Sequence, residues 1–185
     1  MLLDTSGTYT EELEKAKQII NYLLSNLESG DVFTVAKIDS DSFSEKDIVA
    51  KVTLDSRPST ANKQKRAFAS IIEDFLSHVE SSAFTDISGG LLQAIDFLNE
   101  ADVGERYIFI FSDMKEDLAE GFNRDSDFSL GGFTVRALNV TKLRSDNLDP
   151  VEYQSRITDW ESRIVSAGGV WKVVHDLDSP KALEF

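Results

Sequence analysis

The sequence contains no cysteine and only two histidines, His78 and His175. The lack of cysteine excludes disulfides, thiolate zinc sites and cysteine nucleophiles. Two histidines are too few for a multi-histidine metal centre. Any metal that this chain binds must therefore be held by oxygen ligands.

Basic residues are also scarce, with 19 lysines and arginines against 33 acidic residues and a formal net charge of −14. This balance argues against nucleic acid or an anionic membrane surface as a partner. No apolar stretch reaches the roughly 20 residues of a membrane-spanning helix, and no signal peptide is visible. We therefore expect no direct membrane insertion by this segment, and the sequence does not indicate a compartment.

The remaining composition is that of an ordinary globular domain. The 185 residues are 41% hydrophobic and 28% charged, which is enough to bury a proper core. We expect residues 1–185 to form a single monomeric domain. Three residues before Asp4 make a short strand, so we expect the first strand to be truncated at its amino end.

Helical and strand-like patterns alternate along the chain. Helical spacing predicts helices over 10–29, from about Pro58 to Val79, over 87–98 and over 150–167. Strands are predicted over 32–38, 49–54, 106–111, 133–140 and 170–174. Residues 114–132 are less regular and predict a short helix with a long loop. This alternation is typical of an α/β fold with a doubly wound, mainly parallel sheet.

The stretch Asp4-Thr5-Ser6-Gly7-Thr8 directly follows the apolar residues Met1 to Leu3. An apolar run that ends in an acid before a helix indicates a strand entering a loop, and ligands of open α/β sheets bind at such strand ends. A carboxylate and two hydroxyls at that position are oxygen ligands of the kind that suits Mg²⁺. The alternative is that Ser6 or Thr8 only caps the following helix.

Two later stretches strengthen the metal hypothesis: Phe84-Thr85-Asp86-Ile87-Ser88-Gly89-Gly90-Leu91, and the apolar run Tyr107 to Phe111 followed by Ser112-Asp113. With the first motif they resemble the von Willebrand factor A domain. The metal-ion-dependent adhesion site of that family is assembled from D-x-S-x-S, a distant threonine and a distant aspartate. The resemblance covers nearly the whole chain in element order. It implies a six-stranded sheet in the order 3-2-1-4-5-6, with strand 3 antiparallel and helices on both faces.

The resemblance also implies a set of metal ligands, namely Asp4, Ser6, Thr8, Thr85 and Asp113. In the family the hydroxyls ligate directly, the aspartates act largely through water, and a partner carboxylate fills the last position. Mg²⁺ is the expected ion, with Mn²⁺ or Ca²⁺ as alternatives. Such a site docks a protein aspartate or glutamate and withholds a base that could activate water, so we expect a binding module and not an enzyme.

The expected partner presents one acidic side chain within an otherwise basic patch. The residues expected to contact it are Thr5, Gly7, Asp86, Lys142 and Arg144. Two positions depart from the family pattern. Thr8 stands where serine is usual, and Met114 stands where a glycine often follows the third-motif aspartate.

Two other functions fit parts of the sequence. The first motif also resembles the D-x-D-G-T nucleophile motif of haloacid dehalogenase-type phosphatases, in which Asp4 would attack phosphorus while Asp113 and Asp117 would hold Mg²⁺. Ser6, however, stands in the place of the general acid and cannot supply that proton transfer near neutral pH. The remaining alternative is a scaffold domain without metal dependence.

Overall fold

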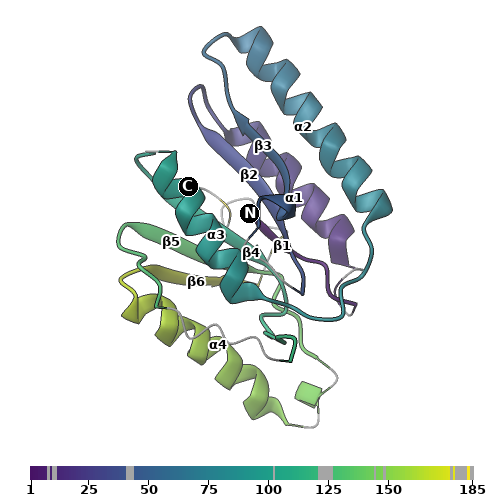
Figure 1. Cartoon of the computed structure of the whole chain (residues 1–185), viewed down its shortest axis with the longest axis vertical. Coiled ribbons are helices and arrows are strands. Elements are labelled where there is room, and N and C mark those ends of the chain that lie inside the picture. Colours follow the sequence, from purple (N-terminus) through teal and green to yellow (C-terminus); the bar gives the residue numbers. More distant parts are fainter. Residues whose placement is uncertain are drawn as a thin grey trace.

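The structure is a computed structural model that describes residues 1–7, 9, 12–40, 44–101, 103–120, 127–143, 145–147, 149–175, 177 and 183. Six strands form one sheet in the order β3-β2-β1-β4-β5-β6 (Figure 1). The strands are β1 (Leu2–Asp4), β2 (Val32–Ile38), β3 (Ile48–Thr53), β4 (Arg106–Phe111), β5 (Phe133–Leu138) and β6 (Val170–Val174). Only β3 is antiparallel to its neighbour. The predicted fold class and strand order are confirmed.

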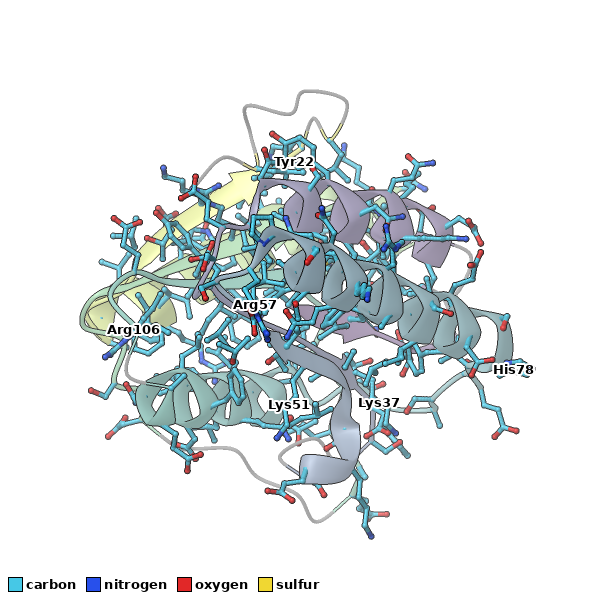
Figure 2. The ribbon with its side chains drawn as sticks, turned by 90° about the horizontal axis from the view of Figure 1, so that it is seen from above. Tyr22, Lys37, Lys51, Arg57, His78 and Arg106 are labelled. Carbon is cyan, nitrogen blue, oxygen red and sulfur yellow. The ribbon has the colours of Figure 1, made fainter. Side chains whose placement is uncertain are left out.

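Four helices cover the two faces of this sheet: α1 (Leu13–Asn26), α2 (Pro58–His78), α3 (Ile87–Glu100) and α4 (Pro150–Ser166). Figure 2 shows α1 and α2 side by side on one side of the strands and α3 on the other. Two short 3-10 helices, η2 (Glu45–Asp47) and η3 (Ser145–Asn147), lie in loops. None of the helices in the described part of the chain is both long and apolar enough to cross a membrane.

The central strands separate two hydrophobic cores. Successive side chains of a strand point to opposite faces, so Leu3 packs in the core under α1 and α2, and Leu2 packs in the core under α3 and α4. In β4 the aromatic residues Phe109 and Phe111 join the first core, while Ile108 and Ile110 join the second. Because β4 is covered on both faces, it is continuously apolar from Tyr107 to Phe111, as expected for a central parallel strand.

The structure differs from the sequence prediction mainly in the connections between helices and strands. No helix occurs among the described residues of the 114–132 segment, namely 114–120 and 127–132, so the short helix predicted there is not found in them. The connections between β2 and β3 and between β5 and α4, where no helix or strand is predicted, hold the 3-10 helices η2 and η3. In η2 the turn forms because Ser44 and Asp47 cap each other's backbone N–H groups, which is a capping box.

Candidate metal site at the carboxyl edge of the sheet

The first and third motifs lie on neighbouring strands at the centre of the sheet. Leu2 and Leu3 of β1 are in register with Ile110 and Phe111 of β4 in a parallel pair. The chain therefore leaves both strands at the same edge. Asp4 closes β1, and Asp113 follows the end of β4 by two residues. In a doubly wound sheet this position is the topological switch point, where ligands bind.

Backbone hydrogen bonds bring the second motif to the same edge. We call residues 4–9 the β1 loop, residues 81–86 the threonine loop and residues 112–117 the β4 loop. Ser82 N–H donates to the carbonyl of Thr5 at 2.8 Å, and Gly7 N–H donates to the carbonyl of Ser82 at 3.2 Å. Thr85 and Asp117 exchange two backbone hydrogen bonds of 2.7 and 3.0 Å. The threonine loop is thus bonded to both other loops.

Asp4 is fixed by hydrogen bonds to both of its carboxylate oxygens. Its side chain is fully buried. Oδ1 accepts a hydrogen bond from Ser6 N–H at 2.9 Å, and Oδ2 accepts one from the Ser112 hydroxyl at 2.6 Å. Burial raises the pKa of Asp4 above its ordinary value, and the hydrogen bonds from Ser112 and Ser6 act in the opposite direction.

Asp113 is a second buried carboxylate close to Asp4. It is 4% exposed, and its Oδ1 accepts a hydrogen bond from Lys115 N–H at 2.8 Å. Burial raises the pKa of Asp113 to about 6; the Lys115 N–H opposes this effect and the charge of Asp4 adds to it. Two carboxylates buried at one edge concentrate negative charge, and this is an arrangement that a cation stabilises.

Helix α4 holds the backbone of the β4 loop from outside. Arg156 Nε donates to the carbonyl of Asp113 at 3.0 Å, and Trp160 Nε1 donates to the carbonyl of Met114 at 3.0 Å. The guanidinium of Arg156 also forms two hydrogen bonds with the buried carboxylate of Asp146, at 3.2 and 2.8 Å. The loop that carries Asp113 is therefore positioned by a rigid helix.

Met114 has the backbone conformation that a glycine adopts freely. Its φ angle is 64°, in the left-handed region, which costs a residue with a Cβ about 1–2 kcal/mol. The side chain is fully buried in the core under α3 and α4. Met114, which stands where the resemblance places a glycine, thus combines a left-handed backbone with a buried side chain.

Two of the residues predicted to ligate metal or contact a partner, Thr8 and Arg144, lie outside the described residues. Ser6 is partly exposed in the β1 loop, and Thr85 is 4% exposed. The structure thus brings the segments carrying Asp4, Ser6, Thr85 and Asp113 together at one edge.

The remaining residues predicted to contact a partner divide into two groups. Gly7 and Lys142 are on the surface. Thr5 is 1% exposed and its hydroxyl donates to the carbonyl of Ile38 at 2.9 Å. Asp86 is fully buried and accepts a hydrogen bond from Gly89 N–H at 2.8 Å, so it caps α3. Both side chains are therefore used inside the domain in this conformation.

The donor set available here consists of two carboxylates and several hydroxyls. Among the described residues, no cluster of three or more histidine, cysteine, aspartate or glutamate side chains could hold a metal ion. A metal at this edge would therefore need hydroxyl oxygens beside Asp4 and Asp113. Hard cations such as Mg²⁺ and Ca²⁺ accept such all-oxygen sets, so the residues present fit the implied ion.

Sequence reasoning missed the residues that hold the β1 and β4 loops, namely Ser112, Arg156 and Trp160. Ser112 carried a visible signal, because it is the first polar residue after the continuous apolar run of β4. The other two contact the β4 loop across more than forty residues of sequence, which no local pattern reveals.

The sequence matches no protein-family model and no curated protein. The structure is similar to that of a von Willebrand factor type A protein from Catenulispora acidiphila, with a TM-score of 0.54 and 14% sequence identity over 98% of this chain. That match covers 38% of the Catenulispora chain, so the present chain spans less than two fifths of its length.

A second similar structure is that of the conserved hypothetical protein BatB from Bacteroides thetaiotaomicron. Its TM-score is 0.50 at 17% identity, and the match covers 98% of this chain and 92% of that one. Identities at this level are informative about the fold alone. Strand order, the antiparallel β3 and these matches agree: the chain has the fold of the von Willebrand factor type A domain.

Proposed function

We propose that this domain is a protein-binding module that depends on a divalent metal ion. Asp4, Ser6, Thr8, Thr85 and Asp113 would hold Mg²⁺, and an aspartate or glutamate of the partner would complete its coordination. The observation that carries the proposal is the convergence of the β1, threonine and β4 loops, joined by hydrogen bonds around two buried carboxylates.

The burial of Asp4 and Asp113 supports a cation at this edge. Removing charged carboxylates from water is costly unless an opposite charge compensates them. Both oxygens of Asp4 already accept hydrogen bonds from the protein, which suits a carboxylate that acts on the ion through water. The direct ligands would then be neutral hydroxyls, and an ion with neutral ligands favours an external carboxylate.

The surface around this edge carries charges of both signs. Lys115 and Lys142 are exposed, as are Asp117 and Glu120. With a net charge of −14 over the chain, long-range attraction favours a partner of basic character. We therefore propose a partner surface with one acidic side chain aimed at the ion and basic side chains around it.

The buried position of Asp4 weighs against the phosphatase alternative. A carboxylate that attacks phosphorus must reach the substrate, whereas Asp4 is fully buried with both oxygens occupied. Ser6 also cannot act as the general acid near neutral pH. This alternative nevertheless makes a distinct prediction for Asp117, which it uses as a metal ligand.

The test is thermal unfolding with Mg²⁺ or Mn²⁺ and with EDTA, for the wild type, Asp113→Asn and the matched control Asp117→Asn. At a metal concentration of 100 times Kd, the expected stabilisation is about 2.7 kcal/mol, which corresponds to a Tm increase of roughly 5–10 °C for a chain of this size. Asp113→Asn should lose this increase, and Asp117→Asn should keep it.

Each alternative predicts another result. Turnover of p-nitrophenyl phosphate that is lost in Asp113→Asn and in Asp117→Asn would favour the phosphatase. Equal Tm values with metal and with EDTA in the wild type would favour the scaffold. Binding of a partner that survives both EDTA and Asp113→Ala would contradict the proposed role of the metal.

A further inference from the structure

Tyr9 connects the β1 loop to the residue that follows β5, Asn139. Its backbone N–H donates to the carbonyl of Ser6 at 2.9 Å, and its own carbonyl accepts a hydrogen bond from Glu12 N–H at 2.9 Å. The position of Tyr9 is therefore linked by one turn to Ser6, and by the next turn to the start of α1.

The Tyr9 side chain crosses the end of β4 inside the protein. It is 1% exposed, and its ring packs edge-on against Phe111, the last residue of β4, with ring centroids 5.1 Å apart. The carboxylates of Asp113 and Asp4 are close enough to act electrostatically on the Tyr9 hydroxyl. Burial raises the pKa of this hydroxyl well above its ordinary value, so it remains a proton donor.

Beyond β4, the hydroxyl reaches the end of β5. It donates to the backbone carbonyl of Asn139 at 2.6 Å and accepts a hydrogen bond from Nδ2 of the same residue at 2.9 Å. That amide group also donates to Glu12 Oε2 at 3.0 Å. Asn139 has a φ angle of 54°, a left-handed conformation that asparagine tolerates better than most residues. Asn139 is thus hydrogen-bonded both to Tyr9 of the β1 loop and to Glu12 at the start of α1.

These contacts span three neighbouring strands in their order in the sheet, β1, β4 and β5. Asp113 follows the middle strand, β4, whose last residue, Phe111, packs against the Tyr9 ring, and Asn139 follows β5. A phenylalanine at position 9 would fill the same space against Phe111. The hydroxyl adds its two hydrogen bonds with Asn139.

We propose that Tyr9 and Asn139 are positioning residues of the metal site: the hydrogen bonds of the Tyr9 hydroxyl with the carbonyl and the amide group of Asn139 hold the β1 loop at a fixed place relative to β4 and β5 and so set the affinity of the site for its ion. This inference rests on the proposed function for its effect on affinity. The geometric part, the anchoring of the β1 loop, does not require a metal.

The variants are Tyr9→Phe, Asn139→Gly and the double variant, with Tyr153→Phe as the matched control. Asn139→Gly removes the amide and keeps the left-handed backbone accessible. Tyr153 offers a comparable hydroxyl, which donates to the carbonyl of Val140 at 3.4 Å from helix α4. The control therefore removes a hydroxyl beside the same strand end without touching the β1 loop.

The first measurement is hydrogen exchange of the backbone amides of residues 9 and 12 in EDTA, with global stability determined in parallel. Each single variant should speed exchange roughly fivefold or more relative to amides of the core strands, because Tyr9→Phe removes both bonds of the hydroxyl with Asn139 and Asn139→Gly removes both bonds of its amide group. The effects of the two single variants should be less than additive in the double variant, because both remove the bond from Asn139 Nδ2 to the Tyr9 hydroxyl, whereas Asn139→Gly keeps the backbone carbonyl that accepts from Tyr9. Tyr153→Phe should leave these two amides unchanged.

The second measurement is the affinity for Mg²⁺ by calorimetry. Tyr9→Phe and Asn139→Gly should weaken it roughly three- to tenfold, and Tyr153→Phe should not. Unchanged exchange at residues 9 and 12 would overturn the inference, as would wild-type Mg²⁺ affinity in Tyr9→Phe. A wild type that binds no Mg²⁺ would contradict the proposed function, while the exchange in EDTA still decides whether Tyr9 and Asn139 anchor the loop.

Discussion

Asp4 and Thr85 lie at the same edge of the sheet, but the protein holds them in different ways. The side chain of Asp4 is fixed by two hydrogen bonds, one from the backbone of Ser6 and one from the hydroxyl of Ser112. Thr85 is held through its backbone, by the pair of hydrogen bonds with Asp117. The carboxylate half of the site is thus part of the interior packing, whereas the threonine half is a loop paired to another loop.

This difference predicts that some substitutions alter the free energy of unfolding and others alter only the affinity for the metal. Changes among the buried carboxylates and their donors should alter the free energy of unfolding even without metal. A change of the threonine hydroxyl should leave that free energy nearly untouched and affect only the ion. The following predictions concern the metal-free protein in EDTA unless a metal is named.

The largest expected effect is a pH dependence caused by Asp113. Its pKa is raised from 3.8 to about 6 in the folded protein, so the folded state binds this proton more tightly than the unfolded state. Protonation of Asp113 therefore contributes stability that is fully present below the ordinary pKa of 3.8 and is lost as the pH rises through the folded value of about 6. The loss amounts to at most about 3 kcal/mol.

Denaturant unfolding of the wild type and Asp113→Asn between pH 4.5 and pH 7.5 measures this effect. The variant should be the more stable protein at pH 7.5, and Mg²⁺ should restore the wild type there. Parallel pH profiles of the free energy of unfolding for the two proteins would show that Asp113 does not cause the pH dependence.

A smaller loss is expected from Ser112→Ala. The substitution removes the donor to Asp4 Oδ2 and the acceptor of Met114 N–H, and both groups are buried. Leaving buried polar groups without partners should cost about 2 kcal/mol. Ser77→Ala is the control, because the Ser77 hydroxyl is exposed on α2 and should matter by less than about 0.5 kcal/mol. Equal losses in both variants would contradict the structure of the carboxylate half.

Met114 allows the backbone of the β4 loop to be tested separately from its side chain. Met114→Ala and Met114→Gly both remove the buried side chain and should both destabilise the protein. At a φ angle of 64°, however, glycine should be the better replacement by about 1 kcal/mol. In an ordinary helical or extended position the order would be reversed, so an alanine variant that is more stable would exclude the left-handed conformation.

The smallest expected change in stability is that of Thr85→Val. Valine has a similar shape and leaves the backbone pair with Asp117 intact, so the change at this buried position should be about 0.5 kcal/mol, the low end of what one hydrogen bond contributes. The affinity for Mg²⁺ should nevertheless fall roughly tenfold, a loss of the size seen when a metal site loses one supporting group. A large loss of stability would mean that the threonine hydroxyl belongs to the interior packing after all.

Much of the fold could be predicted from the sequence, because its strands are short apolar runs with sharp ends. The predicted strands over 32–38, 106–111 and 170–174 agree with β2, β4 and β6 to the residue. Helix α3 begins at Ile87 as predicted and runs two residues further than 98. The strand order came from the family resemblance, since periodicity alone does not order strands.

The candidate ligands of the site could be predicted from the sequence, but the residues that hold them in place could not. Asp4, Ser6, Thr85 and Asp113 occur in recognisable motifs, and the structure brings their segments to one edge. The supports depend on tertiary contacts: Arg156 lies four residues after Glu152 on the same helix, yet it pairs with Asp146 in the preceding 3-10 turn. Local spacing cannot reveal such a choice, because a buried bidentate partner outweighs an exposed one on the helix surface.

The most direct test of the central claim is the line broadening that Mn²⁺ causes in the NMR spectrum of the backbone amides. If one ion binds where the three loops meet, small amounts of Mn²⁺ should first broaden the amides of Ser6, Thr85 and Lys115, and excess Mg²⁺ should reverse the effect. Broadening that starts instead at Glu28 and Asp31, before the amino end of β2, or that spreads evenly over exposed acidic residues, would contradict a metal site at the carboxyl edge.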